Sequence, residues 1–97
     1  MKPLIIHPNA EEEIIVASKY YESKEISLGY KFLLEIELSL KRIQFTPSAW
    51  PEIIKRKRKY VLNRFPYVIF YEIEENRIFV LAVSHIKQKP YYWKNRR

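Results

Sequence analysis

The sequence predicts an α+β domain of two layers, in which a helical hairpin packs on one face of a mainly antiparallel β-sheet. The apolar runs Tyr67–Ile73 and Ile78–Val83 predict the centre of the sheet, because Val, Ile, Phe and Tyr dominate both. Two earlier stretches with apolar residues at helical spacing predict the helices. The expected order of elements is β-α-α-β-β-β, in a single domain that spans residues 1–97.

The first strand and the first helix follow from local signals. Leu4–Ile6 is a short candidate strand, and Pro8 ends it. Asn9 is a favourable N-cap with Glu12 three residues later, as in a capping box, so we expect a helix from about Ala10 to Ser23.

The second predicted helix follows the polar break Ser23–Ser27 and ends before Pro47. Gly29, the only glycine of the chain, is expected to weaken the first turn. Because few residues separate the two amphipathic helices, they should form an antiparallel hairpin. The apolar stripe of the second helix consists of Leu28, Phe32, Ile36, Leu40 and Ile43.

The second half of the chain should supply the sheet. We expect an extended connection at Pro47–Pro51, a strand from about Lys59 to Arg64, and a turn at Phe65-Pro66. In the link Glu74–Arg77, Asn76 is the residue best able to take a positive φ. Since the central strands are apolar on both faces, a C-terminal element, a partner or a target must cover the face away from the helices.

Composition excludes several kinds of site. The chain has no cysteine, and its two histidines are far apart in sequence, so we predict no disulfide, no metal site and no cofactor. The apolar run at the N-terminus is too short for a signal peptide, and no stretch approaches the roughly 20 apolar residues of a membrane helix. We therefore expect a cytoplasmic protein without a membrane partner, and a disordered tail at Lys94–Arg97.

The positive charge is concentrated in the second half. Residues 1–52 carry six Lys or Arg against eight Asp or Glu, whereas residues 53–97 carry twelve against three. This asymmetry indicates an anionic partner, either a nucleic acid or an acidic protein segment. The alternative is that the charge only maintains solubility.

The chain resembles the RelE/ParE toxin superfamily along essentially its whole length. The ordered set of motifs, rather than any single one, carries the resemblance. In the first half the motifs are Ala10 with Glu13, Tyr20-Tyr21-Glu22, Leu28-Gly29 with Phe32, and Ile43 with Pro47. In the second half they are Arg64-Phe65-Pro66-Tyr67-Val68-Ile69-Phe70-Tyr71, Val80-Leu81-Ala82-Val83-Ser84-His85, and Pro90 with Trp93.

The resemblance implies a toxin of a type II toxin–antitoxin pair, with a cognate antitoxin whose C-terminal segment wraps it. ParE-like members of the superfamily poison DNA gyrase, whereas RelE-like members cleave mRNA on the ribosome. The Arg-Phe-Pro-Tyr form of the core is more typical of the ParE-like branch. We therefore predict a gyrase inhibitor, with a ribosome-dependent mRNA endonuclease as the alternative.

The nuclease residues of the superfamily carry over incompletely. The arginine of the central strand falls on Val68, and a second arginine falls near Lys87, which keeps the charge but not the bidentate fork. The C-terminal tyrosine falls near Tyr92 or Trp93. If the nuclease alternative holds, the catalytic candidates are His85, Lys87 and Arg64, with His85 suited to a general base.

Two further groups are candidates for contact with the target or the antitoxin. The basic run around Lys55, Lys57 and Lys59, together with Arg64, can meet an anionic partner, or it can be a solvated charge run in which Arg64 pairs with Glu72 or Glu74. The aromatic cluster Tyr91, Tyr92 and Trp93 can stack on bases, or it can pack back on the sheet.

Overall fold

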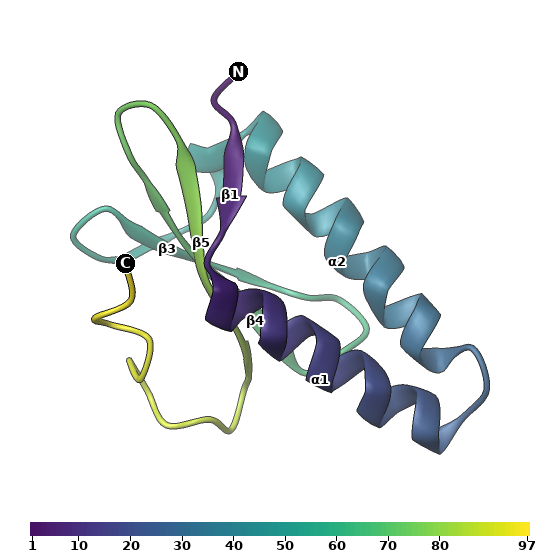
Figure 1. The fold of residues 1–97 in the computed structure, drawn as a ribbon. Coiled ribbons are helices and arrows are strands. Elements are labelled where there is room, and N and C mark those ends of the chain that lie inside the picture. Colours follow the sequence, from purple (N-terminus) through teal and green to yellow (C-terminus); the bar gives the residue numbers. More distant parts are fainter.

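The computed structural model describes all residues, 1–97, and places two helices on one face of a five-stranded sheet (Figure 1). The predicted α+β class is confirmed. The strand order in the sheet is β1-β5-β4-β3-β2, with β1 parallel to β5 and all other pairs antiparallel. In chain order the elements are β1 Leu4–Ile6, α1 Pro8–Lys24, α2 Leu28–Phe45, a 3-10 turn at Pro47–Ala49, β2 Glu52–Ile54, β3 Lys57–Val61, β4 Tyr67–Ile73 and β5 Ile78–His85.

The start of α1 differs from the predicted one. His7, rather than Asn9, is the N-cap, and its imidazole Nδ1 accepts a hydrogen bond from the backbone N–H of Asn9 at 3.0 Å. Pro8 occupies the first helical turn, where the missing N–H costs nothing. The capping box predicted for Asn9 and Glu12 is therefore wrong, because the helix begins two residues earlier and the side chain of His7 takes that role.

The basic segment before β4 also differs from the prediction. Pro47–Ala49 forms a 3-10 turn instead of an extended connection, and β3 covers Lys57–Val61 instead of Lys59–Arg64. A short additional strand, β2, pairs with β3 through a turn in which Arg56 has a φ of 61°. Asn76 does not adopt a positive φ. The β4–β5 turn is instead closed by a backbone hydrogen bond and an ion pair between Glu74 and Arg77.

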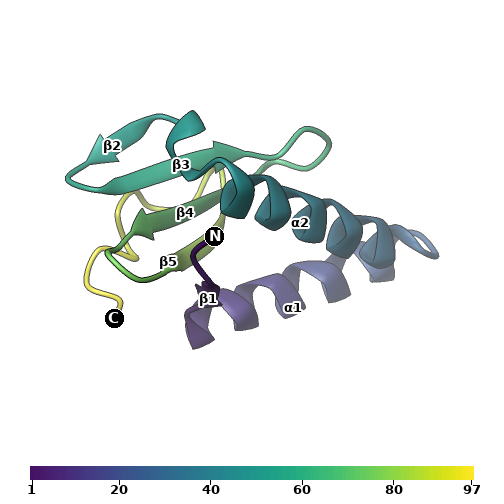
Figure 2. The same cartoon turned by 90° about the horizontal axis from the view of Figure 1, so that it is seen from above.

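The main core lies between the helices and the sheet (Figure 2). Phe32, Ile36 and Ile43 of α2 are buried, as the predicted stripe requires, and they pack in one cluster with Ile69 and Val80 of the central strands. Neither helix is long and apolar enough to cross a membrane.

Gly29 has a packing role that local propensity does not reveal. A Cβ atom at this position would lie 2.4 Å from the backbone oxygen of Ser18 in α1, and the N–H of Gly29 donates to the carboxylate of Glu22 at 3.0 Å. Glycine therefore permits the close approach of the two helices.

We expect Gly29→Ala to lower the free energy of unfolding by about 2–3 kcal/mol, because the added methyl group must push backbone apart. Urea unfolding measures the change, with Tyr30→Ala as the control, since Tyr30 is the exposed neighbour on the same helix. A stability equal to that of the parent would mean that the helices do not approach this closely.

A bulge in β5 changes which side chains face away from the helices. The register of β4 and β5 shifts between Phe70 and Tyr71, so that Leu81 is an extra residue in β5. Leu81 and Ala82 consequently belong to the same small cluster on the outer face of the sheet, together with Phe79 and Trp93. The outer face thus has its own apolar patch, and Trp93 of the C-terminal segment covers it, which is the first of the three coverings that the sequence left open.

Candidate functional site

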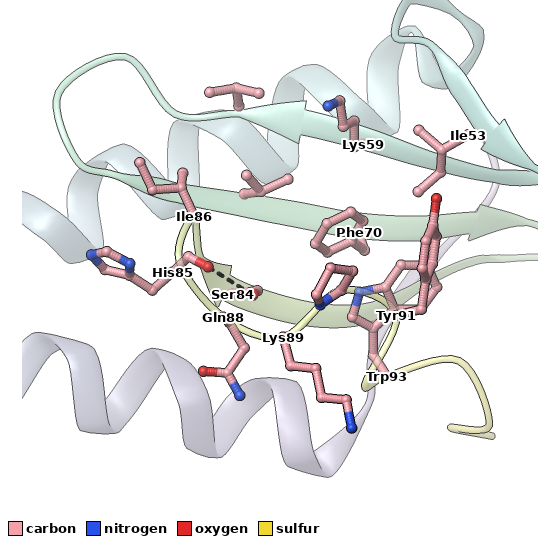
Figure 3. A pocket seen from close by; sticks show the side chains of 13 residues that line it. Ile53, Lys59, Phe70, Ser84, His85, Ile86, Gln88, Lys89, Tyr91 and Trp93 are labelled. Atoms are coloured by element: carbon pink, nitrogen blue, oxygen red, sulfur yellow. Dashed lines mark hydrogen bonds between the residues drawn. The ribbon is translucent and has the colours of Figure 1, made fainter.

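The outer face of the sheet carries a hollow of about 340 Å³ beside the chain that follows β5 (Figure 3). We call it the sheet-face hollow. Its apolar lining consists of Ile53, Val61, Val68, Phe70, Ile86, Pro90, Tyr91 and Trp93, and its polar lining of Lys59, Ser84, His85, Gln88 and Lys89. A mostly apolar lining with two lysines is suited to an apolar group that carries negative charge.

The C-terminal segment folds back on the sheet and forms one wall of this hollow. The indole of Trp93 is stacked on Phe70, with ring centroids 4.6 Å apart, and only 1% of Trp93 is exposed. Tyr91 has a φ of 59° and remains exposed. Of the two interpretations of the aromatic cluster, packing on the sheet therefore holds for Trp93, which has no free ring face for a base.

Glu13 of α1 fastens this segment. Its carboxylate accepts hydrogen bonds from the backbone N–H of Val83 at 2.9 Å, from the Tyr92 hydroxyl at 2.7 Å and from the Arg96 guanidinium at 2.9 and 3.0 Å. Burial raises the pKa of Tyr92 to about 12, and the Glu13 carboxylate also favours the protonated phenol that donates to it. The hydrogen bond to Glu13 likewise raises the pKa of Arg96.

Arg96 lies in the tail that the sequence predicts to be disordered, and the structure differs there. Besides its ion pair with Glu13, the guanidinium donates to the backbone oxygen of Leu81 at 3.0 Å. These long-range bonds give Arg96 a defined position that no local pattern around it indicates.

The geometry of His85 limits it as a general base. Its Nδ1 accepts the backbone N–H of Lys87 at 3.1 Å, and the ring packs edge-on against Tyr67 at 5.2 Å. A neutral imidazole with Nδ1 as acceptor carries its proton on Nε2, so the free ring nitrogen is a donor. His85 in this state can donate a hydrogen bond at Nε2, but it has no lone pair there to take a proton.

Arg64 lies in a different place from His85. It lines a separate hollow beside α2, and its backbone N–H donates to the carboxylate of Glu35 at 3.2 Å. It forms no ion pair with Glu72 or Glu74, which pair with other cations. The side chain of Lys87 does not line the sheet-face hollow. The three nuclease candidates are therefore not assembled around one hollow.

Residues 4–90 match the protein family described as the ParE toxin of the type II toxin–antitoxin system parDE. The chain belongs to this ParE toxin family. It is 27% identical over 88 residues to Toxin ParE2 from two strains of Mycobacterium tuberculosis, an alignment that covers 90% of this chain and 84% of the relative.

The fold of this ParE toxin agrees with a solved structure. A chain described as the chromosomal ParDE TA system from P. aeruginosa superposes with a TM-score of 0.72 at 18% identity, over 88% of this chain and 96% of that chain. At this identity the likeness shows the shared fold, with two helices packed on a mostly antiparallel sheet.

The basic run of this ParE toxin separates into paired and unpaired cations. Lys57 lies 3.4 Å from Glu72, and Arg58 donates to the backbone oxygen of Trp50 at 2.7 Å. Lys55 and Lys59 form no ion pair, and Lys59 lines the sheet-face hollow. Three of the five cations of the run, Arg56, Lys57 and Arg58, thus pair within the sheet, whereas Lys55 and Lys59 remain available to a partner.

The ParE toxin also exposes apolar side chains on its helices, which sequence reasoning missed. The large exposed apolar side chains of α1 and α2 are Ile15, Val16, Tyr20, Tyr30, Leu33, Leu34, Leu38 and Phe45. The sequence could have indicated them, because each helix carries more apolar residues than a single core-facing stripe requires. A second apolar face on a helix of a small domain indicates a partner.

Proposed function

We propose that this ParE toxin inhibits DNA gyrase in the cytoplasm and is neutralised by a cognate antitoxin. Membership of the ParE toxin family supports the proposal, because it places the chain in a toxin–antitoxin system of the parDE type. The observation that carries the choice between the two branches is the separation of His85 and Arg64, which line different hollows.

The chemistry of RNA cleavage argues against the nuclease alternative. Attack of a 2′-OH on the neighbouring phosphate needs a base, an acid and cations around one phosphate. In the sheet-face hollow, Val68 stands at the position of the nuclease arginine and is 8% exposed. Trp93 stacks on Phe70 beside this position, and its indole N–H can donate a hydrogen bond but cannot act as an acid or a base in catalysis. The hollow is lined by Lys59 and Lys89, but it has no arginine for bidentate contact with a phosphate.

The exposed apolar side chains of α1 and α2 support the antitoxin part of the proposal. A segment that wraps the toxin gains most of its binding energy from burying such a surface. Arg64, with Lys31 and Arg42, lines the hollow at the edge of this surface, where acidic residues of the segment can pair with it. Tyr91, Lys55 and Lys59 remain further contact candidates.

The test is a supercoiling assay with purified toxin and DNA gyrase, run beside a reconstituted translation reaction read by primer extension. We expect loss of supercoiling, accumulation of cleaved plasmid, recovery when the antitoxin is added first, and intact mRNA. Codon-positioned, ribosome-dependent cuts with normal supercoiling would establish the nuclease alternative instead.

We expect Arg64→Ala to raise the toxin concentration for half-maximal gyrase inhibition about tenfold, because the substitution removes one charged contact with the target. A tenfold change corresponds to about 1.4 kcal/mol of binding free energy. The fold should persist, since the Arg64 backbone, rather than its side chain, bonds to Glu35. His85→Ala and the exposed Lys19→Ala serve as comparisons in the same assay. Inhibition by Arg64→Ala equal to that of the parent would remove Arg64 from the target surface.

A further inference from the structure

The β2–β3 turn and the C-terminus lie at the same end of the sheet (Figures 1 and 2). Residues of both line a third hollow, of about 370 Å³. We call it the cationic hollow. Three segments far apart in sequence contribute its cations: the β2–β3 turn, the β4–β5 turn and the C-terminal segment. These cations are Arg56, Lys57, Arg77, Lys94, Arg96 and Arg97.

The charges in the cationic hollow are not balanced. Six cations face two carboxylates among the lining residues, those of Glu72 and Glu74. Glu72 pairs with Arg56 and Lys57, Glu74 pairs with Arg77, and Arg96 pairs with Glu13 of α1, which lies outside the lining. Lys94 and Arg97 are the two cations of the lining that form no ion pair. Bringing like charges together costs free energy that a bound polyanion recovers. The excess positive charge therefore favours an anionic ligand at this place.

The lining of the cationic hollow favours a phosphate backbone over an acidic protein segment. Phe79 is its only apolar residue, it is 5% exposed, and the guanidinium of Arg77 lies 4.2 Å from its ring. A protein interface needs an apolar centre, and here that centre is absent. The apolar surfaces of this toxin are instead on the helices and in the sheet-face hollow. Stacking on Phe79 also orients the planar guanidinium, which suits bidentate contact with phosphate oxygens.

We propose that the cationic hollow binds the sugar–phosphate backbone of duplex DNA. The choice of DNA over RNA rests on the proposed function, because duplex DNA is the substrate that gyrase holds. The helical hairpin points away from this end of the sheet in both views (Figures 1 and 2). A toxin held through its helices by a protein partner therefore leaves this end of the sheet, with the unpaired Lys94 and Arg97, open to DNA.

The test measures binding of a fluorescent 24-base-pair duplex to the purified toxin by anisotropy, between 50 and 200 mM salt and without gyrase. Lys94→Glu combined with Arg97→Glu should weaken binding at low salt on the order of tenfold. It should also reduce the slope of log K against log salt by about 2, because each lost phosphate contact removes about 0.9 from that slope.

The matched control is Lys19→Glu combined with Lys24→Glu, which makes the same change in net charge on α1, where both side chains are exposed. We expect the control to bind the duplex within a factor of about two of the parent. Equal weakening by both pairs would overturn the proposal, because net charge alone would then explain the binding. Stronger competition by polyglutamate than by unlabelled duplex would assign the hollow to an acidic peptide, and tighter binding of duplex RNA would assign it to RNA.

Failure of this proposal and failure of the proposed function give different results. Duplex binding that maps to Lys94 and Arg97, in a toxin that leaves supercoiling intact, would overturn gyrase inhibition but not the DNA contact. Gyrase inhibition by a toxin that binds no duplex would do the reverse. The midpoint temperature of thermal unfolding is measured for both double variants. A midpoint equal to that of the parent shows that a loss of binding is not caused by a loss of fold.

Discussion

Trp93→Ala is expected to lower the free energy of unfolding by about 3–5 kcal/mol, the usual cost of removing a fully buried aromatic side chain. The indole stacks on Phe70 and closes the small cluster formed with Phe79, Leu81 and Ala82. Its removal leaves a cavity on the outer face and exposes the centre of the sheet to water. Urea unfolding followed by far-UV circular dichroism measures the loss, since Trp50 complicates a fluorescence readout.

The control for Trp93 is its neighbour Tyr91, which is 47% exposed. Tyr91→Ala should change the free energy of unfolding by less than about 1 kcal/mol, although it removes an aromatic ring two residues away. Comparable losses in the two variants would contradict the packing of the C-terminal segment. In that case the aromatic cluster would be a surface feature, and base stacking would again be open for Trp93.

Glu13→Ala is the second substitution with a large expected effect, about 3 kcal/mol of stability. It leaves the Val83 N–H, the Tyr92 hydroxyl and the Arg96 guanidinium without their common acceptor. The side chain of Glu13 is 23% exposed, so water replaces part of the interaction and the loss stays at the lower end of the range for buried charges.

Amide hydrogen exchange distinguishes this loss from a general weakening of α1. In Glu13→Ala, the Val83 amide should exchange faster than amides of β4, because its hydrogen bond to the carboxylate has gone. Glu12→Ala, at an exposed position in the same helix, should leave the protection of Val83 unchanged. If Val83 stays as protected as in the parent, Glu13 does not hold the C-terminal segment.

The sequence predicted those features that depend on local patterns. Tyr67–Ile73 is a strand as expected, because β-branched and aromatic residues indicate a sheet wherever they occur in such runs. The turn between β4 and β5 shows the limit. Asn76 is the residue best suited to positive φ, but an ion pair and a backbone hydrogen bond close the turn without it.

The candidate functional surfaces were less predictable, since they are made by residues far apart in the chain. In the sequence, Glu13 is one of three consecutive glutamates at the start of a helix, and no neighbouring residue indicates a contact with Arg96. The same holds for His85 and Arg64: both lie in motifs of the superfamily, but only the fold shows that they line different hollows. The spacing of two residues in the sequence does not predict which face of the molecule a side chain in a loop lies on.

The ion pair between Glu13 and Arg96 has a consequence for folding during protein synthesis. The two residues are 83 positions apart, and β1 pairs with β5 across a similar separation. A chain made from its N-terminus at about 5–20 residues per second cannot form the β1–β5 pairing before β5 has left the ribosome, or the contact with Glu13 before Arg96 has left it. The nascent chain therefore keeps an open outer face until Trp93 and Arg96 have emerged. The antitoxin that we propose would have this interval in which to bind the chain before the toxin is folded.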